Sequence, residues 1–512
     1  MVAYPKFNLA WLPAILVGLG VAIPLFYLAI RALDAEPAQV VALLWRPRNW
    51  ELLANTLLLA IGVVAVATLI ALPLAWLEQR TDLPGRRALT LLGIAPLAIP
   101  AYLLAYALLA LGGRGGLADL ALGLQLPRAS GYLGSLWALS LYTFPYLFLN
   151  FRAALAGMDP APEEAARTLG ANPVRVWLRV TLPALLPAFL AGALLIYLHV
   201  LGDFGVVSLM RYETLSHAIY VQYSSAFDRV YAAWLAFLLL FLAGLALVLE
   251  AYLANRWYQA ARSRSLRPRA LVRLGLWRWP LAFLVALLAI FGLGMPFWVV
   301  GYWAGGAWSG VGEALRNSLL AAAPAAALAV VLGLPLAGLA VREKSRLSYF
   351  FERMAYLGYA IPPLALALGL VFASLALVPG IYQTLLLLIW AYTSHFLAEG
   401  LGPLRSSWLA VPRSLEEASR ALGSSAVRTF FRIDLPLLAP GILAGFTVVF
   451  LSALKELPLT FILAPFDFPT LATRIFSFSE EGLFAQAAPY ALCLLGVGLV
   501  LAGFLRLMLE RD

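Results

Sequence analysis

The chain has 512 residues, of which 63% are hydrophobic and 12% are charged, and its formal net charge is +10. Soluble domains carry about 25% charged residues, so this composition excludes an ordinary soluble protein and indicates a helical protein that crosses a membrane many times. The basic excess is not a nucleic-acid signal in such a chain, because the distribution of Lys and Arg sets membrane orientation. The single cysteine, Cys493, excludes an intrachain disulfide, and three scattered histidines lack the spacing of a zinc or haem site.

Apolar runs long enough to cross a bilayer as helices recur through the whole sequence. They predict twelve spans, near residues 8–31, 53–79, 88–112, 132–156, 184–210, 231–255, 281–304, 315–341, 354–377, 382–404, 437–463 and 485–508. The first run is too long for a signal peptide and no convincing cleavage site follows it, so we interpret it as a retained anchor. The predicted fold class is an all-α polytopic membrane protein with about twelve transmembrane helices.

A polar, Arg-bearing stretch follows the fourth span, and a second copy follows the tenth. The copies run over residues 163–183 and 416–436, at an offset of 253 residues. Their shared positions are Glu163, Glu164, Ala165, Ala166, Gly170, Leu182 and Pro183 in the first copy, and Glu416, Glu417, Ala418, Ser419, Gly423, Leu435 and Pro436 in the second. Each copy is expected to form two short helices around a left-handed glycine. Asp159 should cap the first copy, and Ser414 with Glu417 should form a capping box in the second.

The repeat extends beyond these loops. Asn55-Thr56-Leu57 corresponds to Asn317-Ser318-Leu319, and Ile99-Pro100 corresponds to Ile361-Pro362, both at an offset of 262 residues. An even number of spans in each half predicts a parallel repeat, which is a pseudo-dimer about an axis along the membrane normal. We assign residues 1–255 to the first repeat, with its core at 50–255. Residues 281–512 form the second, with its core at 313–508, and residues 256–280 are a basic linker.

The distribution of basic residues predicts the orientation. With the N-terminus inside, the segments that become cytoplasmic hold 26 of the 36 Lys and Arg residues. The positive-inside rule therefore places both termini and both polar loops in the cytoplasm of a multi-pass protein of the cell (inner) membrane. The linker contributes seven of these arginines and no acidic residue. Its simplest partner is anionic membrane lipid, although docking or regulation stays an alternative.

Two carboxylates lie at equivalent places inside apolar runs, each about 20 residues beyond its loop. They are Asp203 and Glu456, and each is followed closely by Gly or Pro. Ionisable groups within a membrane are functional candidates, and a helix breaker beside them suggests a broken helix that lines a cavity. Both should lie toward the external half of the membrane, where they could attract a hard cation. The alternative is structural: Glu456 pairs with Lys455, Asp203 caps a helix, and His199 is a buried hydrogen-bonded histidine.

The duplicated loop resembles the EAA loop of permease subunits in ATP-binding-cassette importers. The resemblance implies two tandem six-helix type I permease repeats, with each loop acting as a cytoplasmic coupling helix seated in a groove of an ATPase subunit. It therefore implies two copies of a cytoplasmic ATPase, which use the ATP, and an external or periplasmic substrate-binding protein. It implies no cofactor bound by this chain. Ser419 departs from the second Ala of the motif, but Ser is also small.

Two further segments resemble ferric-iron importer permeases. They are GDFGVVSLMRYETLSHAIYVQYSSAFDR, which begins at Gly202, and residues 453–482, with K-E-L-P-L-T followed by T-L-A-T-R. The resemblance implies that the transported substrate is ferric iron. Thiamine and phosphonate permeases share the fused layout and stay as alternatives.

Two other classes of membrane protein are weighed against this interpretation. A major-facilitator-type secondary transporter also has twelve spans in two parallel repeats. Its loop motif is matched only partly by Asp82-Leu83-Pro84-Gly85-Arg86-Arg87. A polytopic enzyme would need a catalytic cluster, and no such constellation stands out. The chain also lacks the G-x4-G-K-[ST] loop that cradles phosphates, so we do not expect it to be an enzyme.

Overall fold

The computed structural model describes residues 11–34, 42, 45–226, 228–258, 271–306, 308–343 and 345–509. Across these residues the chain is helical and forms no strand; its one β-bridge joins Thr81 to Val272. A helix satisfies all its backbone hydrogen bonds within one segment, which is the requirement that a lipid environment imposes. The predicted all-α polytopic class is confirmed.

The first half contains the helices that precede the linker. In chain order they are α1 (Trp11–Leu33), α3 (Pro47–Arg80), α4 (Arg86–Ile94), η1 (Ala95–Ala98), α5 (Ala101–Leu111), α6 (Leu117–Leu122), α7 (Gly131–Gly157), α8 (Ala161–Thr168), α9 (Pro173–Val176), η2 (Trp177–Thr181), α10 (Leu182–Ala184), α11 (Leu186–Gly202), α12 (Gly205–Leu209), α13 (Leu215–Ser224) and α14 (Arg229–Tyr258).

The second half repeats this order from its second span onward. Its elements are η3 (Gly275–Trp277), α15 (Arg278–Ala289), η4 (Ile290–Gly294), α16 (Met295–Trp303), α17 (Val311–Arg342), α18 (Arg346–Ala360), α19 (Pro363–Leu377), η5 (Pro379–Ile381), α20 (Leu385–Ala410), α21 (Arg413–Ala421), α22 (Ala426–Thr429), η6 (Phe430–Asp434), α23 (Leu435–Leu454), α24 (Pro458–Leu463), α25 (Leu471–Glu480) and α26 (Phe484–Leu509).

Each predicted span corresponds to helical structure, but several are not straight rods. Within the described residues, eight helices are long and apolar enough to cross a membrane, and three bent pairs bring the number to eleven. The predicted fourth span is α7, which has the length to cross but carries more Tyr and Ser. Residues 8–10 of the first span and most of the basic linker lie outside the described residues.

The third and ninth spans bend sharply at the repeated Ile-Pro pair. The bend is 92° before Ala101 and 107° before Pro363. Ile99 and Ile361 are extended, with ψ angles of 122° and 127°. A residue before proline disfavours the helical region, and proline itself donates no hydrogen bond, so the helix stops there in both halves. The fifth and eleventh spans break in a similar way, and the short helices α12 and α24 follow the breaks.

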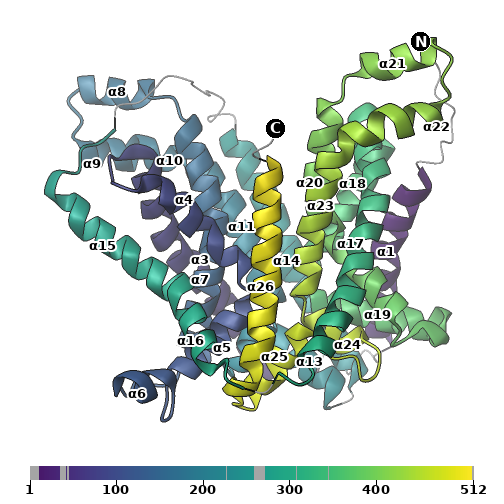
Figure 1. The fold of residues 1–512 in the computed structure, drawn as a ribbon, viewed down its shortest axis with the longest axis horizontal. Helices are drawn as coiled ribbons and strands as arrows, with labels where there is room; N and C mark the ends of the chain where they lie inside the picture. Colours follow the sequence, from purple (N-terminus) through teal and green to yellow (C-terminus); the bar gives the residue numbers. More distant parts are fainter. Residues whose placement is uncertain are drawn as a thin grey trace.

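The two loops with the duplicated motif lie at one end of the molecule (Figure 1). Helices α8 and α21 stand apart at the top of the view, while α13, α24 and α25 lie together at the opposite end. Helix α14 begins at that opposite end. Trp234 near its start donates a hydrogen bond to the carbonyl of Ala32, at 3.0 Å, so the end of α1 lies there too. Helix α1 therefore begins, and α26 ends, on the side of the two loops.

The first span of each half packs on the other half. Helix α1 contacts α17, α18 and α19, whereas α16 contacts α5. The end of the linker runs beside the end of α3, where the backbone N–H of Leu274 donates to the Asp82 carboxylate, at 2.9 Å. The predicted boundaries, 1–255 for the first repeat and 281–512 for the second, follow the order of the chain. In space, the first span of each repeat packs against the other repeat.

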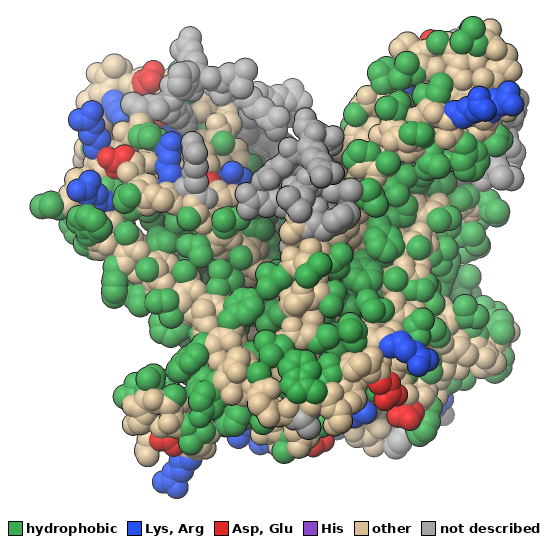
Figure 2. Space-filling view, in the orientation of Figure 1, with side chains coloured by type: hydrophobic (Ala, Val, Ile, Leu, Met, Phe, Trp, Pro, Cys, Tyr) green, Lys and Arg blue, Asp and Glu red, His purple; other side chains and the backbone are tan. Residues whose placement is uncertain are grey.

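Hydrophobic side chains cover the middle of the molecule, and charged side chains gather at its two ends (Figure 2). Exposed residues of the long helices include Ile61, Leu69 and Val248, which are 65%, 75% and 69% accessible. Such a band is the surface that a bilayer covers, because lipid tails replace the water these side chains would otherwise meet.

Candidate coupling loops and central cavity

Both motif loops contain the predicted left-handed glycine. The φ angles of Gly170 and Gly423 are 81° and 83°. The N–H of Ala171 donates to the carbonyl of Ala166 at 3.0 Å, and the N–H of Ser424 donates to that of Ser419 at 3.1 Å. This six-to-one bond around a left-handed residue is the Schellman arrangement that ends a helix. The predicted pair of short helices around a glycine turn is confirmed in each half.

The starts of the two loop helices differ from expectation in one copy. Asp159 accepts a hydrogen bond from the N–H of Ala161, at 3.1 Å, so it caps α8 as expected, although Pro160 stands at the boundary. The expected capping box of Ser414 and Glu417 is wrong. Helix α21 begins at Arg413, which leaves Ser414 inside its first turn rather than before it.

Each loop is fixed to the second span of its half by an ion pair. The Arg80 guanidinium donates to both carboxylate oxygens of Glu163, at 3.2 and 3.3 Å, and Thr181 adds a hydrogen bond at 2.9 Å. In the second half, Arg342 lies 2.6 Å from Glu416. The bidentate pair of Arg80 and Glu163 fixes orientation as well as position, whereas Arg342 and Glu416 make a single close contact. Sequence reasoning missed both arginines, although Arg80 and Arg342 stand at the 262-residue offset.

Most of the remaining motif positions are exposed. Exposed on both loops are Glu164, Ala165 and Pro183, and their counterparts Glu417, Ala418 and Pro436. Leu169 and its counterpart Leu422 are each 88% accessible. Leu182 and Leu435 lie at the junction with the membrane helices, the first exposed and the second half-buried. Both loops therefore present acidic and apolar side chains away from the bundle.

The Ser419 departure has a structural partner. Ser419 is buried, and its hydroxyl bonds that of Thr429 at 2.9 Å. At the equivalent places in the first half stand Ala166 and the buried Val176. An apolar pair in one loop is thus replaced by a hydrogen-bonded pair in the other, which keeps the contact between the two short helices.

A cavity of about 220 Å³ lies between the two halves. Its walls come from the breaks that follow α11 and α23, from the Ile-Pro bends, and from α7 and α20. The polar residues that line it are Tyr102, Tyr142, Tyr146, His199, Asp203, Tyr359, His395, Glu399, Ser452, Lys455 and Glu456. The structure therefore brings all four predicted path residues to one cavity.

Asp203 and Glu456 occupy matching positions, as expected, and both cap a short helix. Asp203 accepts hydrogen bonds from the N–H groups of Val206 and Val207, at 2.9 and 3.4 Å. Glu456 accepts from the N–H groups of Leu459 and Thr460, at 3.0 and 3.2 Å. These bonds satisfy the first orphan donors of α12 and α24. The capping role considered for Asp203 is present, and it extends to Glu456.

Lys455 does not pair with Glu456 as the structural alternative supposed. Its ammonium instead donates to the carbonyl of Leu97, at 3.1 Å, and lies 5.8 Å from the centre of the Tyr142 ring. His199 stacks near the same ring, 4.8 Å between centroids. Among the described residues, its Nε2 has no hydrogen-bond partner. His199 is therefore packed against Tyr142 and, within the described part of the chain, has no hydrogen bond at Nε2, in contrast to the hydrogen-bonded histidine of the structural alternative.

Glu399 is a third carboxylate in the cavity, and sequence reasoning missed it. It lies on α20, and Ser452 donates a hydrogen bond to it. Its counterpart in the first half is Tyr146, so the repeat comparison that found Asp203 and Glu456 could not find it. The signal available was a lone Glu within the tenth apolar run, which is costly in a membrane.

The described residues contain no group of three or more His, Cys, Asp or Glu side chains that could hold a metal ion. A bound hard cation usually needs six or more oxygen ligands. The cavity therefore has acidic walls without a preformed metal site.

Comparison with known proteins decides the class of this chain. The family described as binding-protein-dependent transport system inner membrane component matches twice, over residues 67–259 and 329–511. The chain belongs to this family. Its two matched regions correspond to the two repeats, and each contains one motif loop. The family assignment excludes the major-facilitator and membrane-enzyme alternatives.

Individual permeases are similar along most of the chain. The Fe(3+)-transport system permease protein FbpB 2 of Haemophilus influenzae is 31% identical over 94% of both chains. The ferric transport system permease protein FbpB of Actinobacillus pleuropneumoniae is 25% identical over 90% of this chain and 71% of its own length. The molybdenum transport system permease protein ModB of Escherichia coli is 33% identical, over 39% of this chain and 93% of its own length.

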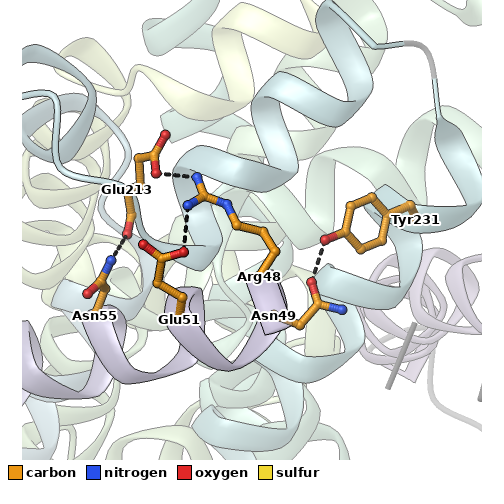
Figure 3. A network of polar contacts seen from close by, with 6 residues as sticks. All are labelled: Arg48, Asn49, Glu51, Asn55, Glu213 and Tyr231. Carbon is orange, nitrogen blue, oxygen red and sulfur yellow. Dashed lines mark hydrogen bonds and ion pairs between the residues drawn. The ribbon is translucent and has the colours of Figure 1, made fainter. Parts of the chain in front are cut away.

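At the end of this permease opposite the loops, polar contacts join the start of α3 to the loop before α13 and, through Asn49 and Tyr231, to α14 (Figure 3). Arg48 at the start of α3 pairs with Glu51, at 2.9 Å, and with Glu213 in the loop before α13. Asn55 donates to the carbonyl of Glu213, at 3.0 Å. In the second half, Asn317 likewise donates to the carbonyl of Pro469, at 3.0 Å. The repeated Asn found in the sequence thus holds the corresponding loop in both halves.

Proposed function

We propose that this permease subunit couples two ATPase subunits, one on each motif loop, to the import of ferric iron delivered by an external binding protein. The observation that carries the coupling role is the duplicated loop: the same glycine turn, the same arginine anchor and the same exposed leucine occur twice at one end of the molecule. A surface loop in contact with water alone has no need of such a repeated exposed apolar group.

The anchors suit a loop that transmits movement. A force applied to α8 reaches α3 through the pair of Arg80 and Glu163, and a force on α21 reaches α17 through Arg342 and Glu416. These side chains are between 11% and 16% accessible, so water screens the pairs less than it screens an exposed ion pair. Each ATPase subunit would then move its own half of the bundle.

Orientation follows from the distribution of charge. We infer that the motif loops and both termini are cytoplasmic, because the segments on that side hold 26 of the 36 basic residues. The exposed Trp277 and Trp279, at the start of the seventh span, suit the membrane interface, and the basic linker before them suits anionic lipid. ATP is used by the partner, and we propose no nucleotide or cofactor site in this chain.

Similarity to ferric-iron permeases makes ferric iron the first candidate for the transported substrate. Similarity to a ferric permease extends over 94% of the chain, and the cavity has three carboxylates, the ligand type that hard cations prefer. Molybdenum is the second candidate, since the molybdenum permease is 33% identical over a shorter region.

The test is uptake by cells that express the permease with its ATPase and binding protein. We expect radioactive iron to accumulate in an ATP-dependent manner and to be lost when either partner is omitted. Accumulation of molybdate without iron would assign the second candidate. Uptake that persists without the ATPase would contradict the coupling role.

A further inference from the structure

Lys455 is unusual in this chain. It is one of three lysines among 36 basic residues, and it lies in the wall of the central cavity. It follows the end of α23, yet both groups that hold its ammonium belong to the first half. These are the carbonyl of Leu97, at 3.1 Å, and the ring of Tyr142, at 5.8 Å. Its side chain therefore crosses the seam between the two halves.

The ionisable groups around this ammonium are mostly acidic. Asp203, Glu399 and Glu456 line the same cavity, and Glu399 lies within electrostatic range of Lys455. No carboxylate of the described residues comes within ion-pair distance of the ammonium. The ammonium thus lies among acidic side chains without forming an ion pair with any one of them.

We propose that Lys455 is the resident cation of the empty cavity and a latch between the two halves. While the cavity is empty, its ammonium partly neutralises the carboxylates and holds the break after α23 against the Ile-Pro bend of the first half. A trivalent cation among the same carboxylates interacts about three times as strongly as a monovalent one at equal distance, so it displaces the ammonium. The displacement breaks the bond to Leu97 and frees the seam. The inference rests on the proposed function in placing this cavity on the transport path and in making the transported ion trivalent.

Two features fit a latch that opens. Lysine is a compact point charge that makes single, rotatable bonds, whereas an arginine can form a rigid forked pair, as Arg80 does with Glu163. The repeat counterpart of Lys455 is Gly202, where an added Cβ would lie only 2.9 Å from Pro363. The matching seam thus has no room for a second side chain, so the permease has one latch rather than two.

Accessibility from outside the cell tests the latch. With Cys493 replaced by Ala, Leu198→Cys in the cavity wall serves as the reporter for an impermeant thiol reagent applied to intact cells. We expect Lys455→Gln to raise the labelling rate about tenfold, as the loss of a hydrogen bond to a charged group implies. Lys455→Arg keeps the charge and the reach, and we expect it to keep the parent rate.

A second variant guards against a folding defect in Lys455→Gln. Tyr142→Leu removes the ring beneath the ammonium and should raise the labelling rate about threefold. Rates are compared per inserted protein. Unchanged rates in both variants would overturn the latch, and so would a loss of inserted protein without faster labelling of the remainder.

Terbium binding tests the resident-cation role. Terbium(III) is a hard trivalent ion whose luminescence is sensitised by nearby tyrosines, and Tyr102, Tyr142 and Tyr146 line this cavity. We expect Lys455→Gln to bind terbium about tenfold more tightly and Glu399→Gln to bind it more weakly. Equal affinity in Lys455→Gln and the parent would overturn this role. Neither measurement uses iron or ATPase, so a failure of iron uptake and a failure of the latch are distinguishable.

Discussion

At the scale of single residues, both halves contain an equivalent ion pair, but its acidic partner lies on a different helix in each half. Arg152 and Arg405 are equivalent in the repeat. Arg152 pairs with Glu78 of the second span, at 2.9 Å, while Arg405 pairs with Glu352 of the ninth span, at 2.7 Å. The place of Glu352 is taken in the first half by Thr90, which donates to Glu78. The acid has moved to the neighbouring helix, and the pair with the arginine has been kept.

This exchange predicts a rescue. Glu352→Thr should lower stability by about 0.5–1 kcal/mol, a modest loss because Arg405 is half exposed. Ala340 is the counterpart of Glu78 and lines the same surface pocket as Arg405, so adding Ala340→Glu should restore most of the loss. Thermal unfolding in detergent measures the stability of the single variant and of the double variant. A double variant no more stable than Glu352→Thr would contradict the equivalence.

Asp203 allows charge to be separated from capping. Asn caps helices about as well as Asp, so Asp203→Asn should keep the protein folded, whereas Asp203→Ala should cost about 1 kcal/mol. If the negative charges of these two carboxylates attract the transported cation, Asp203→Asn and Glu456→Gln should both reduce iron uptake per inserted transporter. Normal uptake in Asp203→Asn, together with lower stability in Asp203→Ala, would restrict Asp203 to its capping role.

At the scale of elements, the glycine turns predict a backbone effect. A Cβ added at Gly170 or Gly423 would meet nothing within 4 Å, so the cost of substitution is conformational and not steric. Val is strongly disfavoured at positive φ, whereas Asn adopts it readily. We therefore expect Gly170→Val with Gly423→Val to reduce ATP-driven uptake severely, while the matched Asn pair stays near the parent. Equal uptake in both pairs would show that this turn is not needed.

The sequence predicted elements better than it predicted their contacts. Run length and the repeat located all twelve helical segments, and the glycines located the loop turns. The Ile-Pro pairs mark the repeat, but proline is tolerated in membrane helices, so its presence does not reveal bends of 92° and 107°. The packing of α1 on the second half and the bond from Lys455 to Leu97 join residues hundreds of positions apart, and no periodicity in one segment encodes them.

At the scale of the whole molecule, orientation is open to direct labelling. After replacement of Cys493, a cysteine at the exposed Ser414 should be shielded from impermeant thiol reagents in intact cells. One at Ser224, near the other end, should react. The same test at Ser265 would probe the basic linker, a position outside the described residues. Labelling of Ser414→Cys from outside would reverse the orientation.

The central claim is that each motif loop carries one ATPase subunit. Leu169→Glu and Leu422→Glu each place a charge in the most exposed apolar position of one loop. The control is Phe466→Glu, which makes the same change at a side chain that is 93% accessible in the loop before α25.

The most direct measurement is the number of ATPase subunits that co-purify with the permease. We expect two copies with the parent and with Phe466→Glu, fewer with either single loop variant, and almost none with Leu169→Glu and Leu422→Glu together. Two copies retained by that double variant, with ATP-driven uptake intact, would contradict the coupling role of the loops.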